Sequence, residues 1–135
     1  MNIVIAQNDR PESRLAFDWV LDHGTAMAGS PTDLHIHVVL VGGADSPASP
    51  NYSSPTLGES LASELHGREV AHTVYAADSD AATQIIEVAE SVSADLIVIG
   101  MRRRSATMKL LLGSQVQRVM LDAPCPVVTI KSPLD

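Results

Sequence analysis

The chain has 135 residues, of which 45% are apolar and only 3% aromatic, and its formal net charge is −7. This length predicts a single domain over residues 1–135 with an aliphatic core, and the charge argues against a protein that binds the phosphate backbone of nucleic acids. The lone cysteine excludes an internal disulfide, no apolar run approaches the roughly 20 residues that span a membrane, and no secretory leader pattern stands at the N-terminus. We therefore expect a cytoplasmic protein with neither a nucleic acid nor a membrane as its partner.

The chain begins with an apolar run at residues 3–6, which predicts a buried strand. Pro11 suits the first turn of a helix, because its missing N–H would have no partner there. Gly24, or the segment 29–31, would end this helix. Its predicted buried face has four residues at helical spacing: Leu15, Ala16, Trp19 and Val20.

Residues 34–41 form the second predicted strand. Side chains alternate along a strand, so Leu34, Ile36 and Val38 share one face, and His35 and His37 share the other. Two histidines make at most half of a metal site, since no further ligand follows at a suitable spacing. The alternative interpretation is structural, with each imidazole held by a hydrogen bond or packed against a helix.

A stretch rich in Gly, Pro and Ser, residues 42–55, predicts a flexible surface loop. Ser54 and Pro55 suit the start of a short helix that Gly67 would end. The apolar positions of that helix lie four residues apart: Leu57, Leu61 and Leu65. Residues 69–76 form the third predicted strand.

The second half of the chain repeats the alternation of helix and strand. The segment 78–80, with two aspartates, supplies N-cap chemistry for a helix that buries Ala82, Ile85, Ile86 and Ala89. Residues 96–99 predict a fourth strand that ends at Gly100. Ser114 and Gln117 fit a capping box for the last helix. The apolar side of that helix would be Val116, Val119 and Met120.

The last predicted strand begins at Val127 and ends at Ile130. Cys125, which stands between two prolines before this strand, is expected to be a small buried residue rather than a nucleophile. Strands that alternate with helices predict an α/β fold, a doubly wound, Rossmann-like parallel sheet in the order 3-2-1-4-5 with helices on both faces. Strands 1 and 4 would then be neighbours, so the loops 7–10 and 100–113 would meet at one edge of the sheet, where ligands bind.

The segment 96–114 carries the strongest functional signal. A strand, a glycine-flanked loop and a helix start form a typical anion site, in which backbone N–H groups and the helix dipole face the bound charge. This loop holds four of the nine cationic residues of the chain: Arg102, Arg103, Arg104 and Lys109. No Walker P-loop, nucleophile elbow, zinc-protease motif or dinucleotide fingerprint accompanies it.

Gly100, Gly113 and Ser114 match the spacing found in the universal stress protein family, whose loop after strand four reads Gly, two residues, Gly, nine residues, Gly, Ser or Thr. At the middle glycine this chain has Arg103. The chain resembles this family from Ile3 to Ile130. The resemblance implies the same fold and a site for ATP or a related adenine nucleotide, with or without Mg²⁺.

Carried onto this sequence, the nucleotide contacts that the resemblance implies fall at Ala6, Asn8, Val38, Ile99, Gly100, Arg103, Gly113, Ser114 and Gln115. Asn8 replaces an aspartate of the nucleotide-binding members, keeps a carbonyl acceptor and adds N–H donors, or it is simply a turn residue. Arg103 either blocks the phosphates or binds them through its guanidinium.

Two functions follow from the resemblance. The main hypothesis is a stress-response module that binds the nucleotide without fast catalysis. The alternative is a homodimeric protein-interaction module that binds no nucleotide, pairs its last strand with the same strand of a second copy, and acts on an unidentified protein partner. A slow ATPase or nucleotidyl transferase is a third idea, for which the sequence offers no evident general base and no predicted catalytic residue.

Overall fold

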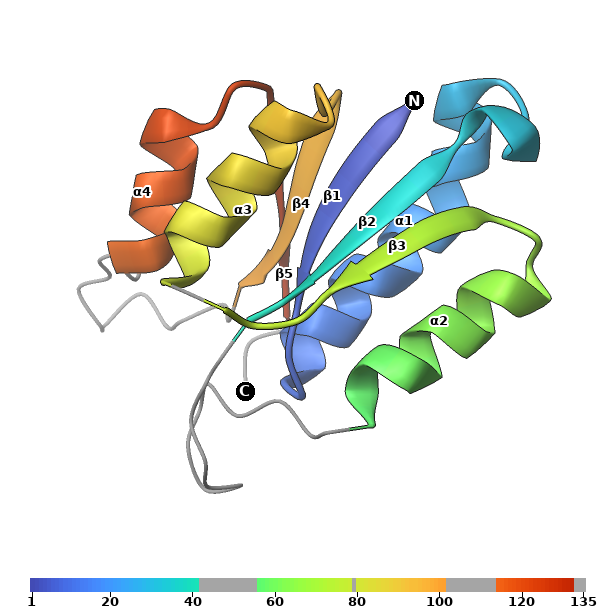
Figure 1. Cartoon of the computed structure of the whole chain (residues 1–135), viewed down its shortest axis with the longest axis horizontal. Helices are drawn as coiled ribbons and strands as arrows, with labels where there is room; N and C mark the ends of the chain where they lie inside the picture. Colours follow the sequence, from blue (N-terminus) through green and yellow to red (C-terminus); the bar gives the residue numbers. More distant parts are fainter. Residues whose placement is uncertain (42–55, 79, 102–113, 133–135) are drawn as a thin grey trace.

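The structure is a computed structural model that describes residues 1–41, 56–78, 80–101 and 114–132. Within these residues, parallel strands form one five-stranded sheet in the order β3-β2-β1-β4-β5 (Figure 1). The strands are β1 (Asn2–Gln7), β2 (His35–Leu40), β3 (Ala71–Tyr75), β4 (Leu96–Met101) and β5 (Val127–Lys131). The predicted α/β fold and strand order are confirmed.

Two helices cover each face of the sheet (Figure 1). Helices α1 and α2 lie on one face and α3 and α4 on the other, which confirms the doubly wound arrangement. The helices are α1 (Pro11–Ala28), α2 (Leu57–Gly67), α3 (Ala81–Ser91) and α4 (Ser114–Asp122), with a 3₁₀ turn at Pro31–Asp33. None of the described helices is long and apolar enough to cross a membrane.

The central strands are buried on both faces because alternate side chains enter two separate cores. Ile3 and Ile5 of β1 pack with Phe17 on the α1–α2 side, while Val4 packs with Ile85 on the α3–α4 side. A strand covered on both faces favours apolar residues on both sides. This explains the continuous apolar run at β1.

The buried face of α1 differs from the prediction. Leu15 is 37% exposed and Trp19 is only half-buried, whereas Phe17 is fully buried. The observed buried face is Ser13, Ala16, Phe17, Val20 and Gly24. The apolar pattern did not predict this face, because two of its buried residues are a serine and a glycine. These small residues let the helix lie close to its neighbours.

Gly24 therefore lies inside α1, where an added Cβ would stand 3.0 Å from Cδ2 of Leu34. The helix continues to Ala28, and Gly29, with a φ of 94°, donates its N–H to the carbonyl of Thr25. Glycine adopts this left-handed conformation without the strain that a Cβ would cause. The second of the two predicted helix ends is the correct one.

Helix α2 ends at Gly67, as predicted. Two smaller predictions are wrong. β4 does not end at Gly100, because this residue still pairs with β5. Met120 of α4 is 47% exposed rather than buried. The predicted loop 42–55, including the proposed helix start at Ser54 and Pro55, lies outside the described residues.

Candidate functional site

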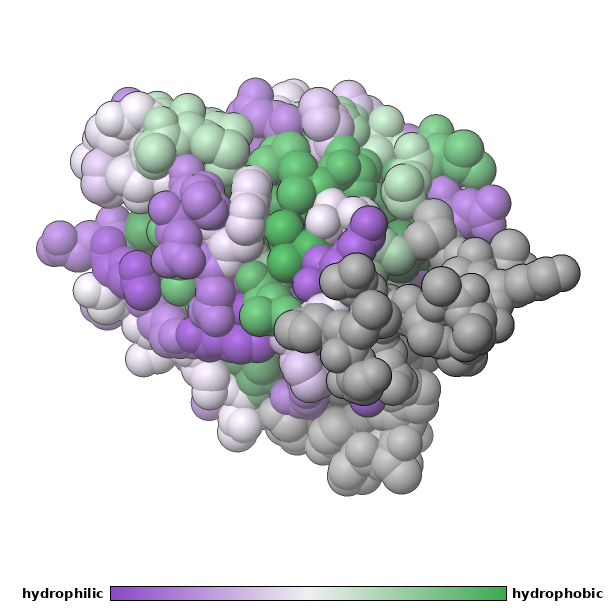
Figure 2. Space-filling view, turned by 180° about the vertical axis from the view of Figure 1, so that it is seen from behind, coloured by the Kyte–Doolittle hydropathy of each residue, from purple (hydrophilic) through white to green (hydrophobic). Residues whose placement is uncertain are grey.

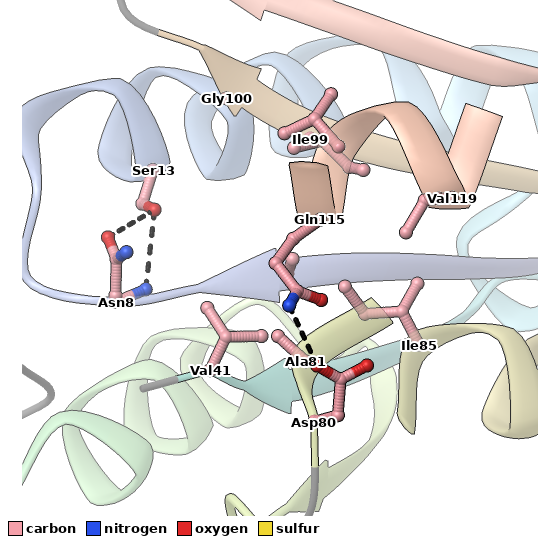
Figure 3. A pocket seen from close by; sticks show the side chains of 12 residues that line it. Asn8, Ser13, Val41, Asp80, Ala81, Ile85, Ile99, Gly100, Gln115 and Val119 are labelled. Carbon is pink, nitrogen blue, oxygen red and sulfur yellow. Dashed lines mark hydrogen bonds between the residues drawn. The ribbon is translucent and has the colours of Figure 1, made fainter. Parts of the chain in front are cut away.

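A cavity of about 330 Å³ opens at the edge of the sheet where β1 and β4, two adjacent strands, end (Figure 3). Ala6 at the end of β1 and Ile99 of β4 form its floor, and Ile85 of α3 and Val119 of α4 form its apolar walls. These four residues are at most 6% exposed. The cavity therefore offers an apolar floor and apolar walls at the predicted switch point of the sheet.

Asn8 and Ser13 form a polar corner of this cavity (Figure 3). The Ser13 hydroxyl donates to Oδ1 of Asn8 at 2.7 Å and accepts from the Asn8 backbone N–H at 3.3 Å. Oδ1 of Asn8 also accepts from the backbone N–H of Arg10 at 3.0 Å. Asn8 is thus both a turn residue and a cavity residue, and its side-chain N–H₂ group has no hydrogen-bond acceptor among the described residues.

Gly100 allows the first turn of α1 to lie directly against β4. A Cβ at this position would stand 2.0 Å from the backbone oxygen of Glu12, a distance that no structure tolerates. The buried side chain of Gln7 supports the same contact by donating to the carbonyl of Ser13 at 2.8 Å. The close approach of helix and strand is thus a sufficient reason for a glycine here, and it also brings Ser13 to the cavity.

A second polar group joins the N-termini of α3 and α4 at the mouth of the cavity. Asp80 caps α3 by accepting from the backbone N–H of Thr83, as predicted. Gln115 of α4 donates to Oδ1 of Asp80 at 2.7 Å and accepts from the Ala82 N–H at 2.9 Å (Figure 3). Arg118 donates to Oδ2 of Asp80 at 2.6 Å. The side chain of Gln115 therefore caps α3 from a different helix.

These contacts keep the Asp80 carboxylate charged. The hydrogen bond from Gln115 is the main cause that lowers the pKa of Asp80 below its ordinary value, followed by the hydrogen bonds from Thr83 and the positive charge of Arg118. Asp80 is the one charged residue that lines the cavity in the part of the chain that the structure describes.

The structure brings together five of the predicted site residues around this cavity: Ala6, Asn8, Ile99, Gly100 and Gln115. Ser114 begins α4 and is exposed, without lining the cavity. Arg103 and Gly113, like the other cations of their loop, lie outside the described residues. Whether any of these residues contacts a nucleotide stays a prediction.

Val38 does not line the cavity. Its side chain is fully buried in the core on the α1–α2 side, and its backbone pairs with Ile5 and Val74 inside the sheet. Val39 is the residue in register with Ala6, and Val41, just beyond β2, reaches the cavity. The resemblance implies a contact through the backbone of Val38, and this contact stays a prediction.

The sequence analysis did not assign Ser13, Val41, Asp80 or Ala81 to the site, although all four line the cavity. Asp80 stood out in the sequence as a helix cap. A helix cap directly after the third strand of such a sheet lies at the same edge as the ends of strands 1 and 4. The sequence could therefore have placed Asp80 near the site. Ser13 and Val41 carry no comparable signal, because helix and loop packing brings them in.

The two histidines of β2 lie on the α3–α4 side of the sheet, where they stack with ring centroids 4.2 Å apart. His37 hydrogen-bonds to Asn2 and Tyr75 at 3.0 Å each, and His35 to Thr73 at 2.9 Å, which confirms the structural interpretation. Burial and the neighbouring His35 lower the pKa of His37 to about 4. Among the described residues, no three His, Cys, Asp or Glu side chains are placed to hold a metal ion.

Cys125 is half-buried rather than buried and packs against the α3–α4 core. Burial, followed by the charge of Asp95, raises the pKa of its thiol. A raised pKa leaves little thiolate at neutral pH, which agrees with the expectation of an unreactive residue.

Comparisons with known proteins agree with this architecture. A sequence model of the Universal stress protein family matches residues 1–131. A universal stress protein from Mycolicibacterium smegmatis is 44% identical over 52 residues, a segment that covers 38% of this chain and 40% of that relative. The chain thus aligns with less than half the length of this curated relative.

Solved structures share the fold. A universal stress protein family protein from Arabidopsis thaliana, solved with AMP bound, has a TM-score of 0.71 at 20% identity, covering 98% of this chain and 92% of that one. A universal stress protein from Archaeoglobus fulgidus, in complex with dAMP, has a TM-score of 0.62 at 19% identity, covering 97% and 98%. At these identities the likeness concerns the fold. The match of the family over nearly the whole sequence shows that the chain belongs to the universal stress protein family.

Proposed function

We propose that this chain binds an adenine nucleotide of the ATP type at the cavity between β1 and β4 and holds it without fast turnover. The observation that carries the proposal is the cavity itself, which combines a buried apolar interior with polar groups at its rim. Its volume of about 330 Å³ suits the base and sugar of a nucleoside. Relatives of the same fold have been solved with AMP and dAMP.

In this proposal the adenine lies between the apolar side chains of Ile85, Ile99 and Val119. The N–H₂ group of Asn8, to which no described residue offers an acceptor, can donate a hydrogen bond to the base or sugar. The phosphates extend toward the start of α4 at Ser114, where the positive end of the helix dipole attracts anions. Arg103, Gly113 and Mg²⁺ belong to this phosphate end, as a proposal that rests on the sequence alone.

Two variants of neighbouring residues in α4 test the site by calorimetric titration with ATP and with AMP, each with and without Mg²⁺. Val116 lines the cavity, and Val116→Trp should fill it and weaken binding by about tenfold or more. Gln117 is exposed and does not line the cavity, so Gln117→Trp should bind like the unaltered protein. Absence of binding at millimolar nucleotide, or equal affinity of the two variants, would contradict the proposal.

A second candidate function, a homodimeric interaction module, is favoured by the exposed edge of the sheet at β5. Within the described parts of the chain this strand pairs with β4 alone, and its apolar side chains are only half-buried. Met120 and Leu121 of the adjacent α4 are 47% and 76% exposed. Figure 2 shows the molecule from behind, with apolar residues gathered at the centre of that face. An uncovered apolar edge strand favours pairing with a second copy.

The hydrogen-bond pattern of β5 allows a sharp test of this second function. The carbonyl of Pro126 and the N–H of Ser132 bond to β4, so even-numbered residues face β4 and the N–H of Thr129 points outward. Thr129→Pro should therefore leave the monomer folded and abolish edge pairing, whereas Val128→Pro should disrupt the sheet itself. Light scattering should give a dimer mass for the unaltered chain and a monomer mass for Thr129→Pro. A monomer mass for the unaltered chain would contradict this function.

A further inference from the structure

The inference concerns the mouth of the cavity and rests on the proposed nucleotide function. The Asp80 side chain there is 41% exposed and Gln115 is exposed, whereas Ile99 and Val119 in the interior are 6% and 1% exposed. The two polar residues thus stand where the cavity opens. A flat base with apolar faces would occupy the interior, so the sugar that joins it to the phosphates would lie beside Asp80 and Gln115.

Both residues keep acceptor capacity that no described residue uses. Oδ2 of Asp80 receives hydrogen bonds from the Thr83 N–H at 3.3 Å, the Thr83 hydroxyl at 3.0 Å and Arg118 at 2.6 Å. Oδ1 receives only the one from Gln115, at 2.7 Å. Oε1 of Gln115 accepts only from the Ala82 N–H, at 2.9 Å. Each oxygen has two lone pairs, so the described residues leave one acceptor position on each.

The charge at this end of the cavity limits which ligand group can bind there. The Asp80 carboxylate is negative, and Arg118, which neutralises it, does not line the cavity. A phosphate beside Asp80 would be repelled, while a neutral hydrogen-bond donor would be attracted. Two neighbouring acceptors suit two neighbouring hydroxyl groups, and carboxylates bind the hydroxyls of ribose in this way in other nucleotide sites.

We propose that Asp80 and Gln115 recognise the vicinal hydroxyl groups of a ribose and make this cavity select ribonucleotides over 2′-deoxyribonucleotides. Arg118 is a positioning residue in this arrangement, because it holds the carboxylate from outside the cavity. Specificity for the sugar thus comes from the ends of two helices, and the base is held by apolar contacts.

The test is calorimetric titration of the full chain with ATP, 2′-dATP and ITP, the last of which lacks the exocyclic amine of adenine. The unaltered protein should bind ATP about tenfold more tightly than 2′-dATP, the effect of losing one hydrogen bond to a charged group. Asp80→Ser keeps an N-cap for α3 but is too short to reach the sugar, so the preference should fall below about twofold. Gln115→Met, which keeps the length of the side chain, should also reduce the preference for ATP over 2′-dATP.

Asp122→Asn serves as the matched control, because Asp122 lies 4.0 Å from Arg118 and does not line the cavity. This variant should keep the tenfold preference. Equal affinity of the unaltered protein for ATP and 2′-dATP would overturn the inference and leave the proposed function intact. A ribose preference that persists in both site variants would also overturn it. The same holds if the site variants change the ratio of the ATP and ITP affinities and leave the ribose preference unaltered. Failure of both ATP and 2′-dATP to bind would contradict the proposed function and this inference with it.

Discussion

The cavity at the ends of β1 and β4 and the histidine pair of β2 are both polar regions, but they use their hydrogen-bonding groups differently. Both ring nitrogens of His37 have partners, Asn2 and Tyr75. At the cavity, the side-chain N–H₂ group of Asn8 has no acceptor and Oδ1 of Asp80 accepts one hydrogen bond, counted over the described residues. Polar groups beside a cavity that still have unused hydrogen-bonding positions indicate a candidate binding site, whereas fully paired groups indicate a structural role.

The difference also shows why residue type alone misleads. Two histidines on one strand resemble the beginning of a metal site, and an asparagine in a turn does not resemble a ligand contact. In the structure the histidines stabilise the sheet, while the asparagine lines the cavity. The surroundings of a polar group, and not its chemistry, decide which role it has.

The largest expected effect concerns Gly100, on which the shape of the cavity depends. Gly100→Ala would place a Cβ 2.0 Å from the Glu12 oxygen and push α1 away from β4, so we expect a loss of about 3 kcal/mol or more in the free energy of unfolding. Urea denaturation measures this loss. Gly67→Ala is the control, since an added Cβ there meets nothing within 4 Å, and the change should stay below about 1 kcal/mol. Equal stabilities of the two variants would contradict the packing argument.

The second effect tests the histidine network through its pH dependence. Folding lowers the pKa of His37 from 6.5 to about 4, so the folded state favours the neutral imidazole. The resulting stabilisation is complete above pH 6.5 and is lost as the pH falls toward 4, by about 2 to 3 kcal/mol. Between pH 7 and pH 4 the unaltered protein should lose that much more stability in urea denaturation than His37→Gln. Identical losses would show that His37 is not held in its neutral form.

The smallest effect concerns the hydrogen bonds that orient Asn8. Ser13 is buried, and Ser13→Ala removes its two hydrogen bonds with Asn8, so we expect a loss of about 1 kcal/mol in unfolding free energy. Asn8 should then turn more freely, and ATP should bind a few-fold more weakly. Ser60→Ala, on the exposed surface of α2, should change neither quantity. A variant at Ser13 that keeps full stability and affinity would mean that the corner at Asn8 does not contribute to the site.

Much of the fold followed from local patterns. Continuous apolar runs marked the first and fourth strands, alternation marked the second, and the succession of strands and helices predicted the order of the sheet that the structure shows. A cavity lies at the predicted switch point of the sheet, where strands 1 and 4 end. The structure confirmed that Ala6, Asn8, Ile99, Gly100 and Gln115 lie together there.

The sequence failed where packing between distant segments decides the outcome. The buried face of α1 depends on how closely Ser13 and Gly24 let it approach its neighbours, and no helical pattern reports that distance. Val41 reaches the cavity from just beyond β2, and no pattern in the sequence marks it as a cavity residue. The hydrogen bonds between Gln115 and the start of α3 join residues 33 positions apart in the chain.

A crystal structure of the protein grown with saturating ATP tests the central claim most directly. The account predicts an adenine between Ile85, Ile99 and Val119, with the ribose hydroxyls within hydrogen-bond distance of Asp80 and Gln115. A nucleotide bound elsewhere on the surface, or an empty cavity at saturating ATP, would contradict it.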